Sequence, residues 1–189
     1  GINKIFVTTM QALSGAGYPG VSSMQIIDNV IPYIEGEEEK LETETQKILG
    51  KIDKDKIKNA TFPVAASCNR VNTVDGHLLS VYIETKIKMN LNDVIDAMTS
   101  FKGFPQDKKL PSAPLKPILY TQKKDRPQPR LDRLSGSVPG MSITVGRLRK
   151  GIDDKSLQLS VLGHNTIRGA AGTNILLGEI LVASGMVNQ

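Results

Sequence analysis

The sequence contains no tryptophan, four phenylalanines, four tyrosines and a single cysteine among 189 residues. With so few aromatic side chains, the hydrophobic core has to be built mainly from aliphatic residues. One cysteine cannot form an internal disulfide, which is typical of proteins that fold in a reducing compartment. No metal site is predicted.

Long hydrophobic segments are absent as well. No apolar run approaches the length of about 18 residues that suggests a membrane span, so no contact with a membrane is predicted. Residues 1–13 have no basic region followed by an uninterrupted apolar core, so no secretory signal is predicted. Together with the single cysteine, these absences favour a cytoplasmic location.

The net charge of +5 comes mainly from one segment. Residues 102–133 contain nine Lys or Arg and three Asp, a net charge of +6, together with six prolines. Because few aromatic residues are interleaved with these charges, the pattern indicates an extended, solvated connection rather than a groove for nucleic acid. We therefore predict no nucleic-acid partner.

Hydrophobic periodicity predicts strands and helices in alternating groups. The predicted strands cover residues 2–13, 62–72, 77–88, 118–121, 142–150 and 156–163. The predicted helices cover residues 37–50, 90–101 with Asn90 as N-cap, and roughly 173–184. Residues 21–34 have helical spacing, but Pro32 limits any helix there. The last two strands read as an antiparallel pair. This order predicts an α+β fold with a largely antiparallel mixed sheet and helices on one face.

Gly15, Gly17 and Gly20 form a G-x-G-x-x-G pattern directly after the first predicted strand. In dinucleotide-binding folds a helix begins at this point, so that its amide groups meet the pyrophosphate. Pro19 and the weak helical pattern that follows contradict that arrangement. The pattern alone therefore does not indicate a Rossmann fold.

Arg70 and His77 are the most informative pair for function. They stand seven positions apart in SCNRVNTVDGH, between two runs that read as neighbouring strands joined through the Asp75-Gly76 turn. Arginine can grip a carboxylate with two parallel hydrogen bonds, and histidine titrates near neutral pH. By spacing alone, a histidine beside a turn is more often a solvated polar residue.

Five motifs resemble those of aspartate-β-semialdehyde dehydrogenase of the archaeal and fungal type. They are MQALSGAGYPG, IPYIEGEEEK, SCNRVNTVDGH, RPQPRLDR and HNTIRGAAGTN, in the family's order. The resemblance implies a fold like the C-terminal domain of glyceraldehyde-phosphate-dehydrogenase-type enzymes. It also implies reductive dephosphorylation of L-aspartyl-4-phosphate to the semialdehyde with NADPH, a step in lysine, methionine and threonine biosynthesis.

The resemblance further assigns roles to individual residues. It makes Arg70 the clamp for the substrate α-carboxylate and His77 the catalytic acid/base. Gln11 would hold the substrate near the thioester carbonyl, and Glu37 would pair with the substrate ammonium, although Glu38 or Glu39 could take that place. Lys40 would bind the phosphate. The residues that contact the NADP cofactor would be Ser14, Gly15 and Asn165. For Gly15 the alternative is a backbone turn that needs positive φ.

The same resemblance implies that the chain is one part of an enzyme. The family's nucleophilic cysteine precedes the Gln11 motif, and Cys68 reads as a core or near-site thiol, so the chain alone is predicted to be inactive. Residues 1–163 would form the substrate-binding and dimerisation domain, and residues 164–189 a segment and helix that return to an NADP-binding domain. A homodimer or a dimer of dimers is predicted. The alternatives are a non-catalytic interaction domain or a related acyl-phosphate reductase such as N-acetyl-γ-glutamyl-phosphate reductase.

Overall fold

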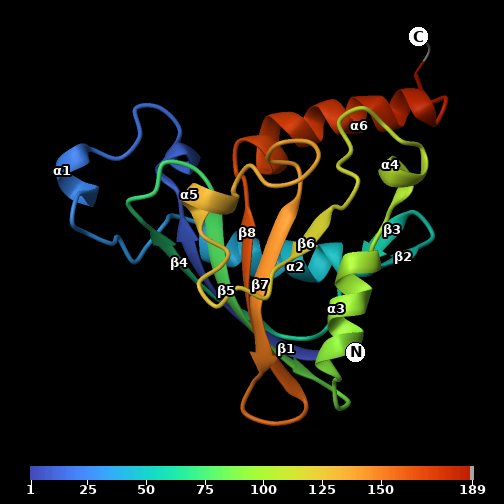
Figure 1. Ribbon diagram of the computed structural model, residues 1–189, viewed down its shortest axis with the longest axis horizontal. Coiled ribbons are helices and arrows are strands. Elements are labelled where there is room, and N and C mark those ends of the chain that lie inside the picture. Colours follow the sequence, from blue (N-terminus) through green and yellow to red (C-terminus); the bar gives the residue numbers. More distant parts are fainter. Residues whose placement is uncertain (188–189) are drawn as a thin grey trace.

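The computed structural model describes residues 1–187 and contains a six-stranded mixed sheet with helices packed on it (Figure 1). The strand order is β4-β1-β5-β8-β7-β6. The strands are β1 (Ile2–Gln11), β4 (Val64–Arg70), β5 (His77–Thr85), β6 (Ile118–Tyr120), β7 (Ile143–Lys150) and β8 (Ser156–Gly163). The antiparallel pairing of β7 with β8 and the α+β class are confirmed.

β4 and β5 are not neighbours, contrary to the prediction. β1 lies between them, parallel to β4 and antiparallel to β5. The connection between β4 and β5 passes over the end of β1, where the Val71 amide donates to the Gln11 carbonyl and the Leu13 amide donates to the Thr73 carbonyl. A hydrophobic pattern identifies a strand but not its partner, and these backbone bonds decide the partner here.

Two helices cover the same face of the sheet. α3 (Leu91–Ser100) begins at Asn90, whose side chain accepts a hydrogen bond from the Asn92 amide, as predicted. Its apolar face packs on the core residues of β7 and β8. α2 (Glu37–Ile48) reaches the same face near the end of β1. Glu37 contacts Gln11, and Gln11 is four positions after the buried Val7, so both side chains of β1 lie on that face. On the opposite face, Phe6 and Tyr82 meet edge to face.

α2 also protects the free edge of β4. Glu38 accepts a hydrogen bond of 2.9 Å from the Cys68 amide, and Glu42, one turn later, accepts one of 2.9 Å from the Ala66 amide. An edge strand otherwise presents unpaired amide groups to other chains. The glutamate-rich helix therefore has a structural task that its composition alone did not reveal.

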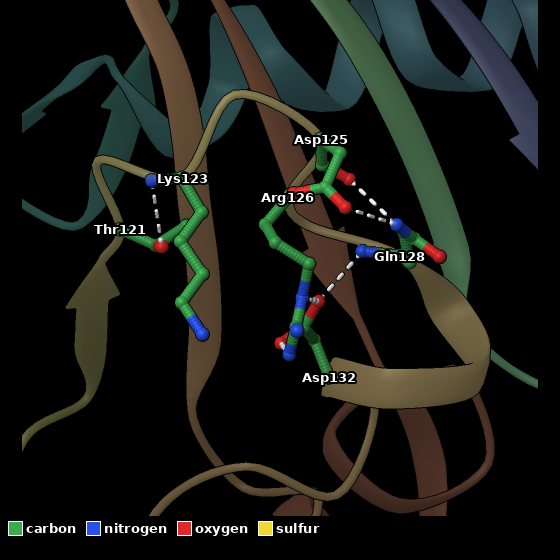
Figure 2. Close-up of polar contacts among 6 residues, drawn as sticks. All are labelled: Thr121, Lys123, Asp125, Arg126, Gln128 and Asp132. Carbon is green, nitrogen blue, oxygen red and sulfur yellow. Dashed lines mark hydrogen bonds and ion pairs between the residues drawn. The ribbon is translucent and has the colours of Figure 1, made fainter.

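The segment 102–133 is folded, so the prediction of a solvated extended connection is wrong. It contains the short helices α4 (Phe104–Asp107) and α5 (Pro129–Asp132), and also β6, which confirms the strand predicted over residues 118–121. Figure 2 shows the reason at one end: Asp132, which is buried, accepts hydrogen bonds from the Arg126 guanidinium and from the Gln128 amide. This pairing holds the pKa of Asp132 below its usual range, and the carboxylate ties the loop together.

Smaller elements complete the chain. A hairpin of β2 (Lys51–Asp53) and β3 (Lys56–Lys58) was not predicted, because three exposed residues per strand carry almost no periodicity. α1 (Ser23–Ile26) is a single turn, in line with the limit set by Pro32. Two short helical turns are also present: η1 (Leu13–Ala16) follows β1, and η2 (Ile167–Ala171) precedes α6.

The last helix, α6 (Gly172–Ala183), lies across one end of the sheet (Figure 1). Leu176 packs against Leu110 and Met141, whereas Ile175 and Leu177 remain more than half exposed. The division into a domain of residues 1–163 and a segment of residues 164–189 stays a prediction. Residues 188–189 of that segment lie outside the described part of the chain. Within residues 1–187, none of the helices combines the length and the apolar character that crossing a membrane requires.

Candidate active site

A cleft of about 650 Å³ lies where β1 ends and β5 begins. Its lining includes every residue to which the sequence assigned a site role: Gln11, Ser14, Gly15, Glu37, Lys40, Arg70, His77 and Asn165. These residues come from β1, η1, α2, β4, β5 and the connection after β8. The structure therefore brings together groups as distant in the sequence as Gln11 and Asn165.

Arg70 forms the buried wall of the cleft, with 6% of its surface exposed. Its Nη1 donates a hydrogen bond of 2.7 Å to the Ala12 carbonyl, which fixes the direction of the guanidinium. Burial lowers the pKa of Arg70, and the nearby Glu37 carboxylate opposes that effect. An arginine stays protonated under such shifts, so the cleft contains a fixed positive charge.

His77 is held in one orientation at the start of β5. The Ala12 amide donates a hydrogen bond of 3.1 Å to Nδ1, so the neutral ring carries its proton on Nε2. Burial, and then the charge of Arg70, lower the pKa of His77 to about 4, while Glu37 acts in the opposite direction. His77 is therefore neutral at pH 7 and is not a solvated turn residue.

Gly15 leaves open the space between these two groups. A Cβ at this position would lie 3.0 Å from Arg70 Nη1 and 3.0 Å from His77 Cε1. Its backbone does not have positive φ, unlike that of Gly17 and Gly20, so the alternative explanation from turn geometry is wrong. The glycine is required here for space next to the two side chains.

Glu37 is the glutamate of the α2 first turn that faces the cleft. Its carboxylate accepts a hydrogen bond of 3.1 Å from the Gln11 amide and lies 3.5 Å from Lys40 Nζ. Glu38 is bonded to the β4 edge instead, and Glu39 is exposed. The geometry thus favours Glu37 among the three alternatives.

Asn165 connects two parts of the site. Its Oδ1 accepts a hydrogen bond of 2.9 Å from the Gly76 amide, and its Nδ2 donates one of 2.7 Å to Ser14 Oγ. The sequence identified Asn165 and Ser14 as candidates but did not indicate that they contact each other. The backbone partners Ala12 and Gly76 were missed, because no side chain signals a backbone hydrogen bond.

Cys68 lies on the same face of β4 as Arg70, as its spacing predicted. It is completely buried, and burial raises the pKa of its thiol. A buried thiol that stays protonated is a poor nucleophile, because the thiolate is the form that attacks. Residues 1–187 contain no group of three or more His, Cys, Asp or Glu side chains placed to hold a metal ion.

The chain matches the family described as "Semialdehyde dehydrogenase, dimerisation domain" over residues 1–168. It belongs to that family. It is 51% identical over 182 residues, 95% of its length, to the aspartate-semialdehyde dehydrogenase of Methanothermobacter thermautotrophicus, covering 52% of that relative. The fold is similar to that of a solved relative. The structure of Candida albicans aspartate-semialdehyde dehydrogenase with NADP matches this chain with a TM-score of 0.87 and 39% identity, over 99% of this chain and 52% of that one.

Relatives of this dimerisation domain do not all carry the same name. A malonyl CoA reductase (NADP) of Metallosphaera sedula is 40% identical over 190 residues, covering 100% of this chain and 53% of that protein. The chain therefore spans about half the length of the curated relatives that it matches.

Proposed function

We propose that this chain is the substrate-binding and acid/base half of an NADP-dependent aspartate-semialdehyde dehydrogenase. The observation that carries the proposal is the convergence of Arg70, His77, Glu37 and Lys40 on one cleft. L-aspartyl-4-phosphate carries an α-carboxylate, an ammonium group and an acyl phosphate. The cleft offers a cation, a carboxylate and a second cation for these three groups.

The positions of the charges suit that substrate. The buried Arg70 is the group for the α-carboxylate, because its guanidinium is fixed by Ala12 and cannot move away. Glu37 binds the ammonium and is itself oriented by Gln11. Lys40, at the exposed rim of the cleft, binds the phosphate that leaves.

His77 provides the proton-transfer group. Its Nε2 carries the proton in the neutral ring and is free of the Ala12 contact, so it donates a hydrogen bond to an oxygen at the reacting carbon. Accepting a proton at Nε2 requires the proton to move to Nδ1 and the Ala12 contact to open. The ring as held in the structure is therefore a hydrogen-bond donor, and a change at Ala12 accompanies its action as a base.

The nucleophile is not among these residues. The reaction needs a thiolate that attacks the acyl carbon, and Cys68, the single cysteine of the chain, is buried with a raised pKa. We infer that the isolated chain has no turnover, which a coupled assay of NADP reduction with semialdehyde and phosphate tests. Measurable activity of the isolated 189-residue chain would contradict the assignment.

The part of the cleft formed by Ser14, Gly15 and Asn165 suits the cofactor. Gly15 has no side chain next to His77, and Ser14 and Asn165 place a hydroxyl and an amide beside it. These residues would border the nicotinamide end, where bound NADPH supplies the hydride. The small size of Gly15 lets a planar ring approach the imidazole and the guanidinium.

The full-length protein that carries this chain provides the main test. We expect Arg70→Lys to lower kcat/KM about 10- to 100-fold, because a bidentate charge-assisted contact is lost. His77→Gln should lower kcat about 10²- to 10⁴-fold. The exposed Arg130→Lys on α5 is the matched control. Equal rates for Arg70→Lys and Arg130→Lys would refute the role of the cleft.

Reduction of malonyl-CoA is a second candidate, favoured by the 40% identity to the malonyl CoA reductase. Both substrates have a free carboxylate for Arg70, but only the aspartyl substrate has an ammonium. We therefore expect Glu37→Gln to weaken use of aspartate semialdehyde and to leave malonyl-CoA reduction unchanged, with the exposed Glu39→Gln as control. If the unmodified protein has a higher kcat/KM with malonyl-CoA than with aspartate semialdehyde, the second candidate is the function.

The partner in the assembly is a second copy of the chain. The family is a dimerisation domain. We infer that the copies meet through the sheet face that carries Phe6 and Tyr82, because Phe6 is 48% exposed there and α2 and α3 cover the other face. The dimerisation-domain family and the exposed Phe6 are the observations that support this interface.

A further inference from the structure

The side-chain amide of Asn165 joins two loops that are distant in the sequence. It accepts a hydrogen bond from Gly76, 89 positions earlier, and donates one to Ser14, 151 positions earlier. Both bonds are short, at 2.9 and 2.7 Å. The oxygen and one N–H of the amide are thus engaged by the protein itself.

Each partner of Asn165 precedes a residue of the cleft. Gly76 is followed by His77, and Ser14 is followed by Gly15, which lies against the His77 ring. The same ring accepts the Ala12 amide at Nδ1. Asn165, Gly76, His77, Ala12 and Ser14 therefore form a closed chain of contacts around the imidazole.

The turn at Gly76 is packed on its other side as well. Gly76 has φ +97°, and a Cβ there would meet Arg133 and Leu162 at 3.3 Å and Pro129 at 3.4 Å. These groups close one side of the buried Gly76 but do not hydrogen-bond to its amide. Asn165 supplies that contact, and it adds to the backbone hydrogen bonds that the Leu13 and Ser14 amides donate to the Thr73 and Val74 carbonyls.

We propose that Asn165 is a positioning residue that fixes the orientation of His77 by clamping the turn at Gly76 to the segment at Ser14. It acts through these loops, in addition to any contact that its remaining N–H makes with a ligand. Any effect of Asn165 on catalysis rests on the proposed function. Its effect on the orientation of the His77 ring does not depend on that function.

The test uses NMR on the ¹⁵N-labelled 189-residue chain. Two quantities are measured: the pKa of His77 from its ring nitrogens, and the exchange rate of the Ala12 amide. Asn165→Ala should raise the pKa of His77 toward its ordinary value by about one unit, because a released ring is better solvated. It should speed exchange at Ala12 by about 10-fold or more, since the Nδ1 acceptor is no longer held in place. Arg70, Glu37 and His164 also face the ring and remain unchanged in this variant.

The control separates positioning from general loosening. Glu179→Ala removes two comparable hydrogen bonds of α6, to the hydroxyl and the amide of Ser112, far from the imidazole. It should leave both quantities unchanged. Ser14→Ala removes only the second bond of the clamp and should give a smaller shift in the same direction, which keeps the proposal testable if Asn165→Ala does not fold.

The same His77 pKa and Ala12 exchange in Asn165→Ala and in the unmodified chain would overturn the proposal. So would equal changes in Glu179→Ala. Absence of dehydrogenase activity in the full-length protein would count against the proposed function alone, because neither measurement involves turnover.

Discussion

The neutral state of His77 links the stability of the fold to pH. Its pKa is about 4 in the folded chain, through burial and then the charge of Arg70, and about 6.5 in the unfolded chain. Between these values the unfolded chain binds more protons. Stability that is fully present above pH 6.5 is therefore lost as the pH falls towards about 4. The loss from this one group is at most about 3 kcal/mol.

The matched perturbation is His77→Gln, which keeps an acceptor for the Ala12 amide but does not titrate. We expect urea unfolding between pH 4 and pH 8 to show a loss of stability towards acid that is larger in the unmodified chain than in His77→Gln, by about 3 kcal/mol. The second histidine is the control: burial also lowers the pKa of His164, and His164 is the smallest of the effects on His77, so His164→Gln should keep most of the His77 contribution. Parallel curves for the unmodified chain and His77→Gln would refute the reasoning.

Three further predictions concern the edge, the cleft and the open face. Glu38→Ala and Glu42→Ala should each lower the free energy of unfolding by about 1.5–3 kcal/mol, because a strand amide loses a charged acceptor, whereas the exposed Glu39→Ala should change it little in the same urea titration. Gly15→Ala should lower the free energy of unfolding by about 1–3 kcal/mol, because its methyl group meets the held Arg70 and His77 side chains at 3.0 Å, and it should weaken semialdehyde binding in the full-length protein, measured as KM. The chain should sediment as a dimer at micromolar concentration and Phe6→Asp should dissociate it; a mass of only 20.5 kDa for the unmodified chain would count against the interface.

The local elements followed from the sequence because their causes are local. α2 begins among acidic residues and α3 begins at Asn90, whose side chain caps it. β7 and β8 lie close in sequence and form the predicted pair. The residues of the cleft were identified through family motifs, which record chemistry but not geometry.

The way in which these pieces meet depends on the folded chain. The insertion of β1 between β4 and β5 depends on backbone bonds from Gln11 and Leu13 to the connecting loop, which no hydrophobic pattern encodes. The pKa of His77 depends on burial and on the distance to Arg70, and the place of Asn165 depends on loops 89 and 151 positions away. Which groups and which local elements exist could be predicted from the sequence, because propensity and periodicity act over a few residues. Desolvation and hydrogen bonding between distant segments arise only when the chain is folded, so the structure decided what those groups can do.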